Sequence, residues 1–182
     1  MPNVVPKLII LDRDGVINYD SDDYIKSPEE WIPIPGSLEA IAQLTAAGFS
    51  VVVATNQSGI ARGYYDLNTL AAIHQKMVNA VKAAGGKLAG IFYCPHGPDD
   101  HCECRKPKDG LIRQIAETFQ IDVTNVPFVG DSTRDIEAAI SAGCRPILVK
   151  TGNGAKSAEK LTSSDCVYED LLDFSTHWLS RP

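Results

Sequence analysis

The chain has 182 residues, 44% of them apolar, and a formal net charge of −6. That length suits one domain with its own core, and the acidic balance disfavours broad binding to nucleic acid or to an anionic membrane. No apolar run reaches the roughly 18 residues of a membrane-spanning helix, and residues 1–11 are too short for a secretory signal, so we expect a cytoplasmic protein.

Strand and helix patterns alternate along the chain. Short apolar runs predict five strands, at Lys7–Leu11, Ser50–Thr55, Leu88–Tyr93, Pro127–Gly130 and Pro146–Val149. Apolar residues at helical spacing predict helices between them, over residues 38–44, 67–81, 111–119 and 136–140. This alternation is typical of a parallel sheet with helices on both faces. We therefore predict a Rossmann-like three-layer α/β/α sandwich in a single domain, residues 1–182.

Capping residues mark the ends of several helices. Ser37 and Asp66 are expected to cap the first two helices. Gly48 and Gly143 are expected to stop the first and the fourth. Beyond Thr162 the pattern is weak, and we expect only a short helix around residues 171–179.

Several conspicuous residues are assigned no chemistry. Trp31 is expected to pack in the core, and His74 to lie on a helix surface. Cys144 and Cys166 are expected to be ordinary buried or surface thiols, and His177 to lie in the tail.

Two carboxylates follow the first predicted strand, in Asp12-Arg13-Asp14-Gly15. Alternation along an extended backbone would send the Asp12 and Asp14 side chains the same way and turn Arg13 away. Two carboxylates at one strand tip can hold a hard cation, and one of them can act as a nucleophile. Taken alone, such a pair more often caps a helix or faces water.

The second predicted strand ends in Thr55-Asn56-Gln57-Ser58-Gly59. Small hydroxyl and amide side chains before a glycine leave backbone N–H groups free to point at an anion. The Thr55 hydroxyl can donate to a phosphate oxygen. The alternative is a polar turn without a ligand.

Basic and acidic groups occur again later in the chain. Lys106 would give a point charge to a phosphoryl group, and Arg105 a bidentate fork, although a basic pair is more often solvated surface. Asp131 follows the fourth strand and can complete an oxygen-rich Mg²⁺ site. Asp135 lies one helical turn on, within reach of a lysine ammonium. The alternative is that Asp131 only caps the next helix.

A loop over residues 94–107 carries three thiols and two imidazoles. In a cytosolic chain such clustering favours a metal over disulfides, and three thiols with one imidazole match a closed tetrahedral Zn²⁺ site. The ligands we favour are Cys94, His96, Cys102 and Cys104. His101 is the rival imidazole, and unliganded thiols are the alternative. Four protein ligands leave no open position, so the expected role is structural, holding the two basic residues that follow.

The order of these motifs, Asp-x-Asp, Thr-Asn, Lys and Gly-Asp-x-x-x-Asp, resembles the haloacid dehalogenase superfamily of phosphohydrolases over nearly the whole chain. The resemblance implies a sheet in the order 5-4-1-2-3 and a Mg²⁺-dependent mechanism through an aspartyl phosphate. Asp12 would be the nucleophile and a Mg²⁺ ligand. Asp14 would act as acid and base, and its backbone carbonyl would bind the metal. Thr55 and Lys106 would hold the phosphoryl oxygens.

The same resemblance makes Asp131 a Mg²⁺ ligand and Asp135 the residue that orients Lys106. Too few residues separate Asp12 from Thr55 for a large cap domain, so loops would supply specificity. Segments 11–15, 55–63, 94–96 and 102–107 resemble the heptose bisphosphate phosphatase family within the superfamily. This implies removal of the 7-phosphate of a heptose 1,7-bisphosphate, on the route to nucleotide-activated heptose for lipopolysaccharide core.

That resemblance also implies a set of substrate contacts, comprising Asp20, Tyr24, Asn56, Gln57, Ser58 and Arg105. The sister family of histidinol-phosphate phosphatases shares the Asp pair and the zinc loop, and is the first alternative. The second is a zinc-stabilised interaction module without catalysis. We expect a monomer that takes a small sugar phosphate and binds neither nucleic acid nor membrane, because no basic stripe or apolar interface pattern is present.

Overall fold

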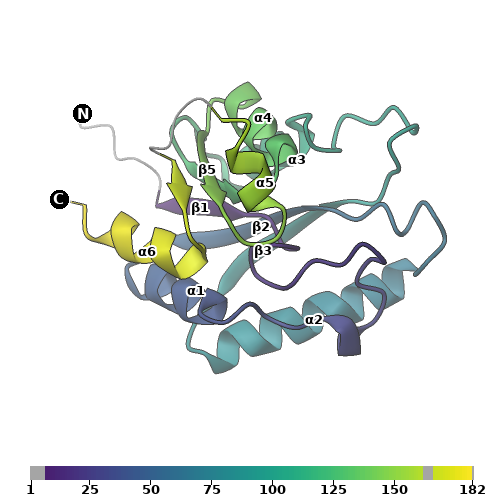
Figure 1. Ribbon diagram of the computed structural model, residues 1–182, viewed down its shortest axis with the longest axis horizontal. Coiled ribbons are helices and arrows are strands. Elements are labelled where there is room, and N and C mark those ends of the chain that lie inside the picture. The colour runs from purple at the N-terminus through teal and green to yellow at the C-terminus, as the bar shows by residue number, and fades with distance from the viewer. Residues whose placement is uncertain (1–6, 162–165, 182) are drawn as a thin grey trace.

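The computed structural model describes residues 7–161 and 166–181. Its centre is a six-stranded parallel sheet in the order β3-β2-β1-β4-β5-β6 (Figure 1). The strands are β1 (Leu8–Leu11), β2 (Ser50–Asn56), β3 (Leu88–Cys94), β4 (Pro127–Gly130), β5 (Arg145–Val149) and β6 (Val167–Tyr168). The five predicted strands are confirmed to within one residue at either end. Residues 1–6, 162–165 and 182, which belong to the predicted domain, lie outside the described residues.

The predicted strand order needs one correction. Read from the other edge, the order 5-4-1-2-3 is present, but β6 lies beyond β5 and was not predicted. In β6, Val167 and Tyr168 pair with Leu148 and Val149. A two-residue strand is too short to show a periodic pattern in the sequence. Pairing with its neighbour β5, rather than its own sequence, stabilises it.

Helices cover both faces of the sheet, which confirms the three-layer sandwich (Figure 1). On one face pack α1 (Ser37–Ala46), α2 (Leu67–Ala83) and α6 (Leu171–Leu179). On the other pack α3 (Gly110–Phe119) and α4 (Thr133–Ser141). Two short helices, η1 (Pro28–Glu30) and α5 (Gly154–Ala158), were not predicted.

The four residues of β1 show how one strand serves two cores. Ile9 and Leu11 join the cluster under α1, α2 and α6, whereas Leu8 and Ile10 join the cluster under α3 and α4. All four are buried because alternate side chains of a central strand point to opposite, covered faces. A continuous apolar run is therefore what this position requires.

The predicted helix ends are mostly confirmed. Asp66 caps α2, accepting a hydrogen bond of 2.8 Å from the Thr69 amide. The Ser37 prediction was wrong, since Gly36 holds the N-cap position of α1. The Ser37 hydroxyl instead donates to the Ile17 carbonyl at 2.6 Å, which fastens the loop before α1. Gly48 follows the end of α1 with φ of 87°, a conformation that favours glycine.

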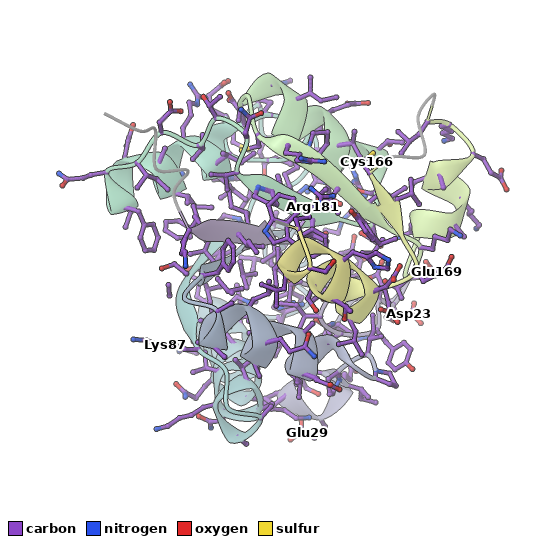
Figure 2. The ribbon with its side chains drawn as sticks, turned by 90° about the vertical axis from the view of Figure 1, so that its left-hand side faces the viewer. Asp23, Glu29, Lys87, Cys166, Glu169 and Arg181 are labelled. Atoms are coloured by element: carbon purple, nitrogen blue, oxygen red, sulfur yellow. The ribbon has the colours of Figure 1, made fainter. Side chains whose placement is uncertain are left out.

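The C-terminal helix α6 lies against α1, in front of the sheet in Figure 2, between Glu169 and Arg181. It occupies the predicted residues, and His177 lies on it. Trp31 packs in the core on the same side of the sheet, as expected. None of the helices in the described part of the chain combines the length and the apolar character that crossing a membrane requires.

Three long connections leave the carboxyl ends of β1, β2 and β3, and they extend to the right in Figure 1. They cover residues 12–36, 57–66 and 95–109. Residues 12–36 are all described and form only the short helix η1, so no cap domain arises there. Because all strands are parallel, the loops meet at one edge of the sheet.

Substituting Phe174 by Ala tests whether α6 belongs to the core. Phe174 is fully buried, so we expect the free energy of unfolding to fall by about 3–5 kcal/mol. Leu179→Ala, at the exposed end of the same helix, is the control and should have a much smaller effect. Urea denaturation followed by circular dichroism measures both, and equal effects would contradict the assignment.

Candidate active site

A cavity of about 350 Å³ opens where the three long connections meet. It gathers every predicted site residue apart from the zinc ligands, namely Asp12, Asp14, Asp20, Tyr24, Thr55, Asn56, Gln57, Ser58, Arg105, Lys106, Asp131 and Asp135. These residues come from segments that are far apart in the sequence. The parallel sheet brings them together because its strands all end at this edge.

Strand register places two carboxylates side by side at the floor of the cavity. Leu11 of β1 pairs with Val129 of β4, so Asp12 is level with Gly130 and Asp131 follows one residue later. The Asp12 amide donates to the Val129 carbonyl at 2.9 Å, which fixes the end of β1. Ligand oxygens of Asp12, Asp131 and Asp135 lie within 4.8 Å of one another.

This cluster carries an excess of negative charge. Burial, together with the charge of Asp135, raises the pKa of Asp12 well above the usual carboxyl range. The same two causes raise the pKa of Asp131 to about 7. A divalent cation would offset this repulsion, and a set of carboxylate oxygens is the chemistry that Mg²⁺ prefers. The residues present therefore fit a magnesium site.

Two glycines let the backbone pass beside the Asp131 carboxylate. A Cβ atom on Gly15 would lie 2.1 Å from Asp131 Oδ2, and one on Gly152 would lie 2.2 Å from the same oxygen. Both glycines have positive φ, of 81° and 57°. Oδ2 also accepts a hydrogen bond of 2.9 Å from the Asn153 amide. Larger residues at positions 15 and 152 would displace this carboxylate.

Lys106 is a buried cation held by three partners. Its ammonium donates to Asp12 Oδ1 at 3.0 Å, to Asp135 Oδ1 at 2.7 Å and to the Ala54 carbonyl at 2.9 Å. Burial alone would lower its pKa, but the two carboxylates raise it above that of an ordinary lysine. The ammonium therefore stays charged beside the carboxylate cluster.

The Asp135 carboxylate binds Lys106 and the start of α4, so it is not an open ligand for a metal. Its Oδ2 accepts from the amides of Asp131 and Ser132, and from the Ser132 hydroxyl at 2.8 Å. Ser132 is the N-cap of α4 and forms a capping box with Asp135. The alternative in which Asp131 only caps this helix is therefore wrong.

Arg13 lies where the sequence did not predict it. The side chain was expected to turn away from the carboxylates, but its guanidinium bonds to Asp14, with Nε 2.9 Å from Oδ1 and Nη2 3.1 Å from Oδ2. The strand ends at Leu11, so the alternation that places side chains on opposite faces no longer applies at position 13. Arg13 is fully buried.

His74 was also predicted wrongly. It is buried on α2, and Arg13 Nη1 lies 3.1 Å from its Nε2. Burial and the charge of Arg13 lower the pKa of His74 to about 3. Its position was visible in the sequence, because it lies four residues after Leu70 and next to Ile73, on the apolar stripe of the helix.

The amides of Asn56 and Gln57, at the end of β2, are already engaged within the protein. Gln57 donates to Thr55 Oγ1 at 2.9 Å and to Asp14 Oδ2 at 3.0 Å, and it accepts from the Tyr65 hydroxyl at 2.6 Å. Asn56 donates to the Lys106 carbonyl at 3.1 Å and accepts from the Lys106 amide at 3.0 Å. Both residues line the cavity, and their amides brace the groups around them.

The connection after β1 forms one wall of the cavity. Asn153 Nδ2 donates to Asp20 Oδ2 at 3.2 Å, and burial together with the charge of Asp14 raises the pKa of Asp20. The Tyr24 ring meets Tyr64 edge-on, with centroids 5.2 Å apart, which joins this wall to the connection after β2.

Two arginines at the cavity were missed. Arg62 and Arg134 are exposed and line it together with Arg105. No ion pair within residues 7–161 and 166–181 involves any of the three. Arg62 lies in segment 55–63, which carries part of the family resemblance, whereas Arg134 stands alone in the sequence, and only the folded arrangement shows that they form a group with Arg105.

The four favoured zinc ligands converge in the loop after β3. Ligand atoms of Cys94, His96, Cys102 and Cys104 lie within 4.8 Å of one another. The Nδ1 atom of His96 lies 3.5 Å from the Cys94 sulfur and 3.3 Å from the Cys104 sulfur. His101 is exposed and outside the group. Three thiols and one imidazole around a common point fit a closed zinc site.

Comparisons with known proteins agree with the resemblance that we read from the sequence. The HAD-hydrolase-like family model matches residues 103–174. The D-glycero-beta-D-manno-heptose-1,7-bisphosphate 7-phosphatase of Pseudomonas putida is 59% identical over 166 residues, which are 91% of this chain and 95% of that protein. The Bordetella bronchiseptica phosphatase of the same name is 58% identical, over 91% and 93% of the two chains.

Solved structures agree as well. The crystal structure of D,D-heptose 1,7-bisphosphate phosphatase from B. bronchiseptica, complexed with magnesium and phosphate, has a TM-score of 0.91 and 55% identity, and the match covers 94% of this chain and 97% of that one. The enzyme from Burkholderia thailandensis has a TM-score of 0.75 and 44% identity, over 96% and 99%. The predicted fold class is confirmed.

Two histidine substitutions distinguish the rival imidazoles of the loop. Elemental analysis should find about one zinc ion per chain in the unmodified protein, as expected for a closed four-ligand site. His96→Asn should lower that content, and His101→Asn, the control, should leave it unchanged. Zinc lost equally from both variants, or absent from the unmodified protein, would contradict the assignment of the cluster.

Proposed function

Because the chain belongs to the family of D-glycero-β-D-manno-heptose-1,7-bisphosphate 7-phosphatases, within the HAD-like hydrolases, we propose that it removes the 7-phosphate of that heptose bisphosphate and leaves the 1-phosphate. One observation carries the proposal. The carboxylates of Asp12 and Asp131 and the ammonium of Lys106 share one cavity large enough for a sugar phosphate.

Asp12 is the nucleophile in this proposal. Its Oδ1 accepts from the Arg13 amide at 2.8 Å and from Lys106 at 3.0 Å. No donor among the described residues reaches Oδ2, which leaves that oxygen for the phosphorus atom. Attack forms an aspartyl phosphate and expels the sugar oxygen. Lys106 and the Thr55 hydroxyl hold the phosphoryl oxygens, and Lys106 exchanges one of its protein partners to do so.

Asp14 handles the proton in both halves of the reaction. It donates a proton to the leaving sugar oxygen, and then takes one from the water that hydrolyses the aspartyl phosphate. Its side chain lies at the cavity beside Asp12, with the orientation that Arg13, Asn18 and Gln57 impose. The two aspartates thus divide the work, one attacking and the other transferring protons.

Magnesium completes the site in this proposal. The side chains of Asp12 and Asp131 and the backbone carbonyl of Asp14 would hold it. The structural relative from B. bronchiseptica was solved with magnesium and phosphate. When bound, the ion neutralises charge between the carboxylates and the incoming phosphate. Zinc would be held by the four ligands of the loop and would fix Arg105 and Lys106, which follow Cys104 directly.

The three unpaired arginines favour a bisphosphate over histidinol phosphate. Arg62, Arg105 and Arg134 surround the cavity without carboxylate partners among the residues that the structure describes. Guanidinium groups bind phosphate well and repel the ammonium of histidinol phosphate. A second phosphate on the substrate would bind these groups while the first meets Asp12.

Further expectations belong to the same proposal. The chain would act as one domain over residues 1–182, as a monomer in the cytoplasm, on a small sugar phosphate rather than nucleic acid. The product, a heptose 1-phosphate, has the form that nucleotidyl transfer requires, which suits a route to nucleotide-activated heptose. A non-catalytic interaction module is disfavoured because it would have no use for a buried carboxylate cluster with a charged lysine.

Asp12→Asn tests the nucleophile. An amide cannot form the acyl phosphate, so turnover with Mg²⁺ should fall by about three orders of magnitude or more. Phosphate release measures the rate, and circular dichroism verifies the fold. Asp22→Asn makes the same change in the exposed part of the loop and should keep full activity. Substantial turnover by Asp12→Asn would refute the assignment.

A comparison of two substrates tests the specificity. We expect kcat/KM at least about tenfold higher on heptose 1,7-bisphosphate than on histidinol phosphate, because the latter places a cation among arginines. Arg134→Gln should raise KM for the bisphosphate and leave p-nitrophenyl phosphate unaffected. Arg145→Gln, outside the cavity, is the matched control. Faster cleavage of histidinol phosphate would reverse the choice of substrate.

A further inference from the structure

The carboxylate of Asp14 is held by three side chains, two from the connection after β1 and one from the connection after β2. Oδ1 accepts from Arg13 Nε at 2.9 Å and from Asn18 Nδ2 at 2.9 Å. Oδ2 accepts from Arg13 Nη2 at 3.1 Å and from Gln57 Nε2 at 3.0 Å, and Arg13 Nη2 also lies 2.8 Å from Oδ1. Two donors on each oxygen fix the plane of the carboxylate, so its side chain has one orientation rather than several.

Arg13 contributes the most directional part of this arrangement. A guanidinium fork on a carboxylate sets both position and plane, which a lysine ammonium cannot do. The Arg13 side chain is 1% exposed, whereas that of Asp14 is 21% exposed toward the cavity. The fork therefore binds Asp14 from the protein side, and the part of the carboxylate that remains exposed faces the cavity.

His74 holds Arg13 from behind. Its Nε2 accepts from Arg13 Nη1 at 3.1 Å, across 61 positions of sequence. The ring accepts this hydrogen bond only when neutral, and burial with the nearby guanidinium lowers the pKa of His74 to about 3. The Gln57 amide is braced in a similar way by the Tyr65 hydroxyl at 2.6 Å.

Stability alone does not explain a buried guanidinium at this place. A buried ion pair adds little to the free energy of folding compared with apolar residues of similar volume. The buried Arg13 lies between Asp12 and Asp14 in the sequence. The orientation of the Asp14 carboxylate decides whether a proton reaches the leaving oxygen. Small displacements of such a group reduce the rate strongly.

We propose that Arg13, held in place by His74, is a positioning residue that aims the Asp14 carboxylate for proton transfer to the leaving group. The inference rests on the proposed phosphatase function and assigns roles to two residues beyond its nucleophile, metal and phosphate groups. Neither residue touches the substrate. Both act through the orientation of Asp14.

The experiment compares two esters that differ in their need for a proton. The sugar alkoxide of heptose 1,7-bisphosphate requires protonation as it leaves, whereas the phenolate of p-nitrophenyl phosphate leaves without help. Because kcat/KM includes only the steps up to departure of the leaving group, its ratio between the two esters isolates the acid role of Asp14. The fraction of folded protein cancels in that ratio, so a partly unfolded variant still gives a valid result.

The variants are Arg13→Lys, which keeps the charge and loses the fork, and His74→Leu, which removes the acceptor. Each should lower kcat/KM on the bisphosphate by about tenfold to a hundredfold, a part of the rate that a general acid supplies. Each should change kcat/KM on p-nitrophenyl phosphate by less than about threefold, since that step needs no acid. His74→Gln, which restores an amide acceptor, should recover most of the loss.

Gln75→Leu is the matched control, because Gln75 is the next residue on α2, is exposed and pairs only with Asn79 in the described chain. It should leave both rates unchanged. Equal losses on the two esters, or no loss on either, would overturn the positioning role while leaving the phosphatase assignment intact. An unmodified protein that cleaves neither ester would overturn the proposed function and this role together.

Discussion

The candidate site depends on one buried cation. The ammonium of Lys106 lies between the carboxylates of Asp12 and Asp135 and donates also to the Ala54 carbonyl, so it joins the ends of β1 and β2 to the start of α4. A buried charge without partners is costly, and removing any one partner leaves the others uncompensated. The three contacts of the Lys106 ammonium are therefore expected to form or to be lost nearly together. The sheet supplies the framework, and this ion pair network fixes where the groups at its edge stand.

Much of the framework could be predicted because the central strands are covered on both sides. Runs such as residues 8–11 and 51–54 are apolar throughout, which distinguishes buried parallel strands from amphipathic ones. The acidic and hydroxyl residues that follow them then fall at one edge of the sheet by topology alone. The strand β6 could not be foreseen, because its two residues are held by pairing with β5 rather than by a pattern of their own.

The errors at the site have a common origin. Alternation was extended past Leu11 to Arg13, although the chain had already left the strand, and a long side chain in a turn can fold back onto its neighbour. His74 was placed on a surface by residue type, although its spacing from Leu70 puts it on the buried stripe of α2. Local pattern thus identifies elements better than it identifies the partners of long polar side chains, which are set by tertiary packing.

The thiol and imidazole cluster stands only two positions before the buried lysine. Cys104 belongs to the cluster and Lys106 to the cavity. A residue inserted between them would therefore prevent the two side chains from occupying their positions at the same time. Residues 98–101, between the two pairs of ligands, are exposed and supply no ligand atom. Insertions and deletions can therefore accumulate at this outer bend during evolution, whereas the number of residues between Cys104 and Lys106 has to stay constant.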